Sequence, residues 1–306
     1  MDIGVVLPAG AGVKNVVDAA VALGREAADL GLTSAWLPQR FDFDSIALAG
    51  IVGREVPELA VGSSVVPIFA RHPILVASQA QTTQAATGGR YTLGLGLGAE
   101  VFVEPVFGTP YELPIRRLRE FLTTFRSVVD TGAVDFVGET IIARTPMPAT
   151  VPGGSPIPVV VAAMGPQALR VAGELADGTL PLLAGPKALA EHIVPAITKA
   201  AAGRPAPRIV AAVPGLVAAD VDAVREAAAA QTAFYDTIPS YQRIVELSGA
   251  SKAAELVTVG DEETVAKTVR DYLDAGATEI VFTQTNLGTE EDRRRTWRLL
   301  GELAQG

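Results

Sequence analysis

Residues 158–183 have the sequence PVVVAAMGPQALRVAGELADGTLPLL. This stretch predicts a buried strand, a Gly-Pro turn, a short helix and a second buried strand, which together form a βαβ unit. The turn leaves backbone N–H groups at the start of the helix, where a phosphate or another anion can bind. A Gly-Pro pair before a helix is also common as plain chain punctuation, so the turn alone leaves both interpretations open.

The same pattern, in which a helix ends at a glycine and a short apolar strand follows, recurs at residues 27–37, 85–97 and 273–282. Glycine suits the left-handed conformation after a helix, and a short apolar run is typical of a strand covered on both faces. Eight alternating strands and helices predict a (β/α)8 TIM barrel of the α/β class, with a doubly wound sheet as the alternative. The predicted strands are residues 2–7, 33–37, 59–66, 91–97, 157–162, 178–183, 208–217 and 278–283.

Two stretches do not fit simple strand–helix units. Residues 131–156 contain VDFVGETIIA, which predicts a small hairpin, and residues 220–260 predict two helices separated near Pro239. We expect both to be insertions on loops that follow strands, where they would lie over the active site of a single domain spanning residues 1–306.

Composition excludes several classes of function. The net charge of −9 argues against nucleic acid and anionic membranes as partners. The absence of cysteine excludes disulfides and thiolate chemistry, and two histidines, His72 and His192, argue against a metal site. The first residues carry no secretory signal pattern, and no apolar run is long enough to cross a membrane, so we expect a cytoplasmic protein.

The predicted strand ends, where barrel enzymes place their chemistry, are poor in acid and base groups. The first strand is predicted to end at Pro8-Ala9-Gly10. The ends lack the nucleophile, lysine or histidine–carboxylate pair that a hydrolase or aldolase needs, so they favour a flat organic cofactor that carries its own reactivity. The polar candidates at these ends are Gln39, Ser63, Ser64, Glu100, Gln284 and Asn286.

Several segments, taken in order, resemble the bacterial luciferase-like family, and within it the branch that uses the deazaflavin coenzyme F420. They are GSSVVPIFARHP (62–73), RYTLGLGLG (90–98), PYELPIRRLREFLTTFRSVV (110–129) and PIPVVVAAMGPQALRVAGELADGTL (156–180). The resemblance covers most of the chain, although residues 200–260 add little to it.

The resemblance implies a cofactor site on specific residues. It implies a non-proline cis peptide between Ser64 and Val65, with Ser63–Ser64 as the alternative, and a phosphate site at the turn that begins near Ala163. The family often has Gly-x-Gly-Glu at the fourth strand, whereas this chain has one more residue before Glu100. The implied cofactor contacts are Ser63, Ser64, Val65, Gly96, Gly98, Ala99, Ala163, Met164, Gly165, Pro166 and Gln167.

Departures from the family pattern limit what can be carried over. Related deazaflavin dehydrogenases often have an acidic residue or histidine just after the second strand, where this chain has Gln39. Gln39 is no general base, but its amide can hydrogen-bond a ring carbonyl or a substrate. Glu100 is the candidate proton donor or acceptor. We expect His72 to start a helix and Trp36 to pack at a strand end.

These observations predict a coenzyme F420-dependent oxidoreductase that transfers a hydride between C5 of the deazaflavin and a small organic substrate. The first alternative is an FMN-dependent monooxygenase of the same superfamily, and the second is a cofactor-binding relative without catalysis. The aromatic residues Phe102, Phe107, Phe234, Tyr235 and Tyr241 suggest an apolar substrate or a packed lid. The resemblance also implies a homodimer.

Overall fold

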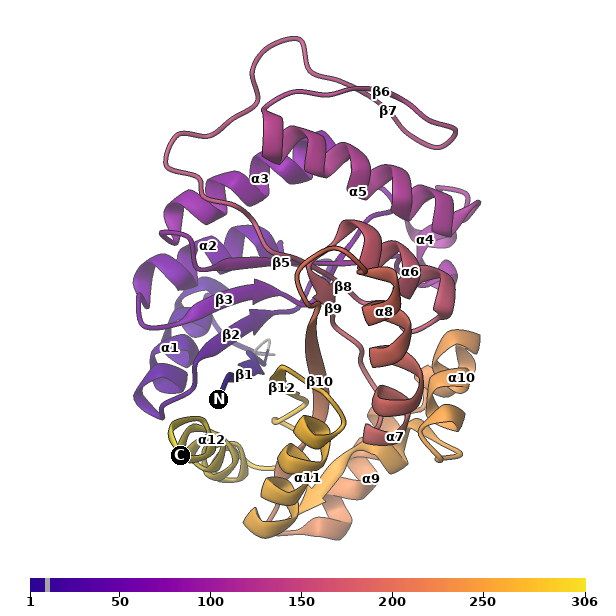
Figure 1. The fold of residues 1–306 in the computed structure, drawn as a ribbon. Coiled ribbons are helices and arrows are strands. Elements are labelled where there is room, and N and C mark those ends of the chain that lie inside the picture. The colour runs from indigo at the N-terminus through magenta and orange to yellow at the C-terminus, as the bar shows by residue number, and fades with distance from the viewer. Residues whose placement is uncertain (9–11) are drawn as a thin grey trace.

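The computed structural model describes residues 1–8 and 12–306, and within them eight parallel strands close into a barrel (Figure 1). The ring is closed because β9 pairs with β10, β10 with β12, and β12 with β1. The predicted (β/α)8 barrel is therefore confirmed; the predicted end of the first strand lies partly outside the described residues. The barrel strands are β1 (Ile3–Val6), β2 (Ser34–Leu37), β3 (Ala60–Ser63), β5 (Tyr91–Gly96), β8 (Val159–Val161), β9 (Gly178–Thr179), β10 (Arg208–Val217) and β12 (Glu279–Thr283).

Helices surround this barrel (Figure 1). No helix in the described part of the chain is long and apolar enough to cross a membrane. The helices are α1 (Val16–Asp29), α2 (Ser45–Glu55), α3 (Pro73–Ala86), α4 (Glu100–Phe107), α5 (Pro114–Thr131), α6 (Pro166–Leu175), α7 (Pro186–Ala188), α8 (Val194–Ala200), α9 (Val221–Thr232), α10 (Pro239–Leu247), α11 (Glu262–Asp274) and α12 (Glu290–Gln305).

Local capping signals set the helix boundaries. The Asn15 side chain accepts a hydrogen bond from the N–H of Val17 at 2.9 Å and starts α1. His72 caps α3 through the N–H of Ile74 at 3.3 Å, directly before Pro73, which confirms its predicted structural role. After α11 the chain turns at Gly276, whose φ of 99° lies in the left-handed region.

The interior of the barrel is filled by side chains from several strands. Trp36 is 2% exposed and packs there with Val160, Leu180 and Val281. A Cβ atom at Gly62 would come within 2.5 Å of the Trp36 ring, so only glycine leaves room for the indole. The packing role predicted for Trp36 is confirmed.

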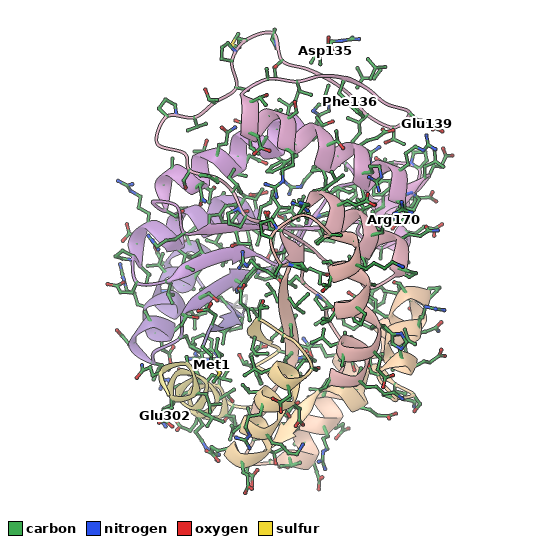
Figure 2. All side chains as sticks on the ribbon, in the orientation of Figure 1. Met1, Asp135, Phe136, Glu139, Arg170 and Glu302 are labelled. Carbon is green, nitrogen blue, oxygen red and sulfur yellow. The ribbon has the colours of Figure 1, made fainter. Side chains whose placement is uncertain are left out.

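The hairpin predicted in residues 131–156 exists, but its predicted location was wrong. Its strands β6 (Asp135–Val137) and β7 (Ile142–Arg144) follow α5 and precede β8, so the hairpin lies on a helix-to-strand connection. Figure 2 shows Asp135, Phe136 and Glu139 at the outer edge of the molecule, beyond α5. Within the described residues, no part of 131–156 lines the cavity at the strand ends.

The second irregular stretch does lie on a loop that follows a strand. Helices α9 and α10 are separated by a short turn of helix, Tyr235–Thr237, as predicted. The predicted strand at residues 59–66 is divided in two, and its second part, β4 (Val66–Pro67), continues alongside β5. One short strand was not predicted: β11 (Thr258–Gly260) pairs with the end of β10. Both β4 and β11 lengthen the barrel wall near the carboxyl ends of the strands.

Candidate active site

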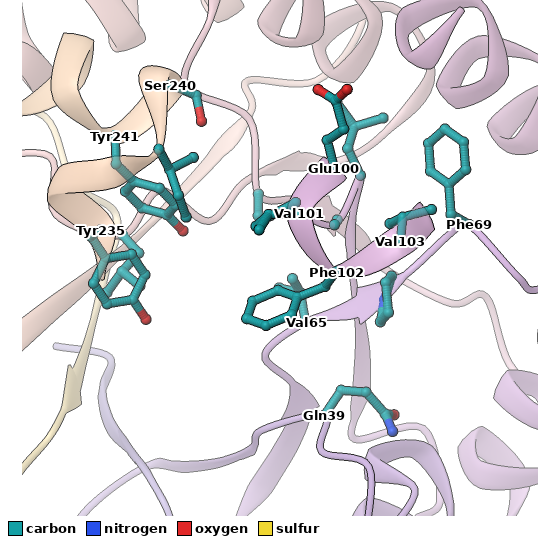
Figure 3. A pocket seen from close by; sticks show the side chains of 18 of the residues that line it. Gln39, Val65, Phe69, Glu100, Val101, Phe102, Val103, Tyr235, Ser240 and Tyr241 are labelled. Atoms are coloured by element: carbon teal, nitrogen blue, oxygen red, sulfur yellow. The ribbon is translucent and has the colours of Figure 1, made fainter. Parts of the chain in front are cut away.

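A cavity of about 1900 Å³ opens at the carboxyl ends of the barrel strands. Ordinary ligand pockets have volumes of about 300–1,000 Å³, so this one has room for a flat cofactor and a second molecule. Its floor comes from strand ends and its rim from α4 and residues 234–241 (Figure 3). The floor residues are small or apolar: Val6, Val65, Gly96, Ala162, Leu180 and Ala212.

The end of β3 forms one wall of the cavity. The peptide bond between Ser64 and Val65 is cis, as the family resemblance implied. The glycines of β5 permit this wall to form, because a Cβ atom at Gly94 would lie 1.9 Å from the carbonyl oxygen of Ser63. A Cβ at Gly96 would lie 2.7 Å from a methyl group of Val65. The glycine-rich sequence of β5 is thus explained by close backbone approach.

Two predicted cofactor contacts lie behind the cavity wall rather than in it, contrary to expectation. Ser63 is fully buried, and its Oγ accepts hydrogen bonds from the N–H of Gly94 at 2.9 Å and the hydroxyl of Tyr91 at 3.1 Å. Ala163 is buried below the turn, where its carbonyl accepts from Thr179. The other predicted contacts line the cavity: Ser64, Val65, Gly96, Gly98, Ala99, Met164, Gly165, Pro166 and Gln167.

The N-terminus of α6 opens onto the cavity without a side-chain cap. Gly165 is the N-cap residue, and a Cβ there would have open space around it. In the described part of the chain, the N–H groups of Gln167 and Ala168 face no protein acceptor. Such N–H groups, together with the helix dipole, favour an anion, so this turn has the geometry of a phosphate site.

Glu100 lines the cavity at the first turn of α4, but it is solvent-exposed. Figure 3 shows its carboxylate pointing away from Gln39, the other predicted catalytic residue. Tyr111 packs beside α4, where its hydroxyl donates to the carbonyl of Gly98 at 3.1 Å. Burial, and to a lesser extent the charge of Glu100, raises the pKa of Tyr111. The role of Glu100 as a proton donor or acceptor stays a prediction.

The Gln39 amide is fully occupied within its own loop. Its Nε2 donates to the carbonyls of Arg40 and Phe43 at 2.7 and 3.1 Å. Its Oε1 accepts from the N–H and the hydroxyl of Ser45 at 3.2 and 3.0 Å. These contacts indicate that Gln39 positions the loop before α2, and its predicted contact with a ring carbonyl or a substrate stays a prediction.

Aromatic side chains form the rim of the cavity. Phe102 of α4 lies 5.1 Å from Phe234, measured between ring centroids, so α4 and the segment after α9 meet there. Tyr235 and Tyr241 form an edge-on pair at 4.7 Å. These residues were noted in the sequence, but their convergence was not predictable, because Phe102 and Phe234 are far apart along the chain.

The basic groups that line the cavity are already paired. Arg40 donates to Asp42 at 2.8 and 3.1 Å, a hydrogen bond that lowers the pKa of Asp42. Arg71 donates to Asp44 at 3.0 Å, and Asp44 in turn caps α2. The sequence did not reveal these pairs. No group of three potential metal ligands occurs within residues 1–8 and 12–306.

A (β/α)8 barrel whose large cavity has an apolar floor and a helix N-terminus suited to a phosphate is typical of an enzyme that uses an organic cofactor. The chain belongs to the luciferase-like monooxygenase family, whose sequence model matches residues 1–292. It is therefore an oxidoreductase. The family resemblance inferred from the sequence is confirmed.

Individual relatives agree with this membership. The chain is 30% identical over 260 residues to the 5,10-methylenetetrahydromethanopterin reductase of Archaeoglobus fulgidus. The aligned region covers 81% of this chain and 77% of that protein. An F420-dependent secondary alcohol dehydrogenase solved with an F420–acetone adduct superposes with a TM-score of 0.80 at 17% identity, covering 98% of this chain and 97% of the other.

A flavin enzyme has the same fold. The oxygenating constituent of 3,6-diketocamphane monooxygenase from Pseudomonas putida, solved with FMN, superposes with a TM-score of 0.73 at 16% identity. The match covers 99% of this chain and 97% of that chain. At this identity the likeness shows a shared fold, and it does not indicate which cofactor this chain binds.

Proposed function

We propose that this protein is a coenzyme F420-dependent oxidoreductase that acts on a small organic substrate. The observation that carries the proposal is the uncapped N-terminus of α6, which opens onto a cavity large enough for a deazaflavin and a substrate together. The relative from Archaeoglobus fulgidus, a methylenetetrahydromethanopterin reductase, and the F420-dependent secondary alcohol dehydrogenase of the same fold support this assignment.

The residues of the cavity fit such a coenzyme. The N–H groups of Gln167 and Ala168 would hold the phosphate, and Gly165 leaves space for it. Val65 and Gly96 would support the flat ring from one side of the apolar floor. A bound deazaflavin supplies hydride transfer at C5. The chain's own contribution is to orient the ring and to exclude water with the aromatic rim.

The same phosphate site could serve FMN, so the experiment compares the two cofactors directly. Purified protein is titrated with coenzyme F420 and, in parallel, with FMN, and binding is followed by cofactor fluorescence. Tight binding of the deazaflavin is expected. Preferential binding of FMN would assign the protein to the flavin monooxygenases instead, and binding of neither would reject the proposal.

Two variants at one position test the phosphate turn. Gly165→Asp places a carboxylate at the N-cap. It would accept hydrogen bonds from the free N–H groups and repel a phosphate, so coenzyme binding should weaken about tenfold or more. Gly165→Ala is the matched control, because its Cβ has open space and adds no charge. Equal coenzyme affinity in the two variants would show that the phosphate does not bind at this turn. Thermal unfolding checks that both remain folded.

A further inference from the structure

Two phenol groups of the cavity have no assigned task. Tyr235 lies in the short turn of helix between α9 and α10, Tyr241 lies in the first turn of α10, and both line the cavity. Figure 3 shows them on the side across from Val101 and Phe102. Their rings meet edge-on, with centroids 4.7 Å apart and planes inclined at 60°.

Their hydroxyl groups differ from those of the other tyrosines near the site. Tyr91 donates to Ser63 and Tyr111 to Gly98, each at 3.1 Å. The hydroxyls of Tyr235 and Tyr241 donate to no group in the described part of the chain, although both rings are partly buried. Because both residues line the cavity and their hydroxyls are not used within the protein, the pair has donor capacity left for a ligand.

The protonation state of the pair favours donation. Burial raises the pKa of Tyr235, and burial together with the neighbouring Tyr235 raises that of Tyr241. Both groups are therefore neutral phenols at physiological pH. A neutral phenol donates its hydrogen to a carbonyl, ether or hydroxyl oxygen.

The structure holds these donors in fixed positions. The Tyr241 ring packs against a small cluster that contains Leu183, Val245 and Ala253. The turn that carries Tyr235 is tied down because the Asp236 carboxylate accepts from the N–H of Ala253 at 2.8 Å. The Asp236 carbonyl also accepts from Gln242 at 2.6 Å. Donors fixed in this way discriminate between ligands with and without a matching oxygen.

The surroundings of the pair restrict the rest of the ligand. Phe102, Phe234 and Ile238 line the cavity near the pair with apolar surface, and Thr237 and Ser240 add two hydroxyl groups but no charge. The arginines of the cavity, Arg40 and Arg71, are paired with Asp42 and Asp44. A carboxylate or phosphate on the substrate would therefore find no unpaired cation there, which disfavours acidic substrates.

We propose that Tyr235 and Tyr241 bind an oxygen atom of a neutral, largely aromatic substrate, and that they set the specificity of the site for such compounds. The inference rests on the proposed function only in treating this side of the cavity as the substrate side. Binding of the substrate oxygen requires no coenzyme, so the two proposals can fail separately.

The test uses two probes of nearly equal shape, acetylnaphthalene and ethylnaphthalene, which differ by one carbonyl oxygen. Binding to the coenzyme-free protein is followed by probe fluorescence. The wild type should bind both. Tyr235→Phe and Tyr241→Phe should each weaken binding of the ketone about fivefold, with little change for the hydrocarbon. Tyr272→Phe, a buried tyrosine of α11 outside the cavity, is the matched control and should change neither affinity.

The outcomes separate the proposals. Loss of binding that is equal for ketone and hydrocarbon, or no loss in either tyrosine variant, would overturn the oxygen-binding role. Failure of both probes to bind the wild type would overturn the aromatic substrate class. Discrimination by the tyrosines in a protein that binds no coenzyme F420 would reject the proposed function and retain this inference. Circular dichroism of each variant establishes that it is folded.

Discussion

The backbone N–H and the hydroxyl of Thr140 both donate hydrogen bonds to Oε2 of Glu120, at 2.8 and 2.6 Å. The same carboxylate accepts from the N–H groups of Glu139 at 2.9 Å and Ile141 at 3.0 Å. Glu120 belongs to α5 and is 8% exposed, so it fastens the turn of the β6–β7 hairpin to the outside of the barrel. Burial acts to raise the pKa of Glu120, but the hydrogen bonds together outweigh it and lower the pKa.

Glu120→Gln is expected to lower the free energy of unfolding by about 1–3 kcal/mol at neutral pH, because an amide cannot accept all of these hydrogen bonds. Since the folded-state pKa is depressed, this stabilisation is present above the ordinary carboxyl pKa and is lost as the pH falls through the folded-state value. Urea unfolding across a pH series measures it, and the difference between wild type and variant should shrink in acid.

Glu139→Gln is the control for the hairpin. Glu139 pairs with Arg116 at an exposed position, and exposed ion pairs contribute about 0–1 kcal/mol. A loss of stability as large as that of Glu120→Gln would show that any charge change in this region has the effect. Because the hairpin lies outside the cavity, coenzyme binding should be unchanged in both variants.

Local rules were sufficient to predict the barrel from the sequence, whereas the rim of its cavity depends on distant contacts. Helix caps such as Asn15 and turns such as Gly276 act within a few residues, so strands and helices could be placed. Helix α4 was not predicted because its short sequence, EVFVEPVF, is mostly apolar and contains Pro105, which is unfavourable inside a helix.

In the candidate site, too, the features set by adjacent residues were predictable and those set by distant contacts were not. The turn at Gly165 follows from a strand, a glycine and a proline that are adjacent in the chain, and it lines the cavity as expected. The hydrogen bonds of Gln39 within its own loop were not predictable, because its residue type indicates what an amide can bind and not which partners the folded loop supplies. The position of Ser63 behind the wall likewise depends on Tyr91 and Gly94 of the neighbouring strand.

Gln39→Glu tests the positioning role of the Gln39 amide. The variant keeps the size and the acceptor but loses both donors, and it sets a carboxylate against the carbonyls of Arg40 and Phe43. We expect the free energy of unfolding to fall by about 1–3 kcal/mol. Gln231→Glu, at an exposed position of α9, should change it by less than about 0.5 kcal/mol. Unchanged stability in Gln39→Glu, with altered ligand binding alone, would return Gln39 to a substrate-contacting role.

The contact between Phe102 and Phe234 is expected to slow the exit of ligands from the cavity. The two rings join α4 to the segment after α9, and each is about two-fifths exposed, at 42% and 39%. An aromatic pair contributes about 0.5–1.5 kcal/mol beyond its buried area, so Phe102→Ala and Phe234→Ala should each speed the release of acetylnaphthalene about three- to tenfold. Stopped-flow dilution of the complex measures the rate.

The double variant decides whether the pair acts as a unit. If the two rings close the rim only together, removing the second after the first has little further effect, so the combined increase should be close to that of either single variant. Phe136→Ala, on the hairpin outside the cavity, is the matched control and should leave the release rate unchanged. An increase in the double variant equal to the product of the single increases would mean that the rings act independently, and that no closure of the rim depends on their contact.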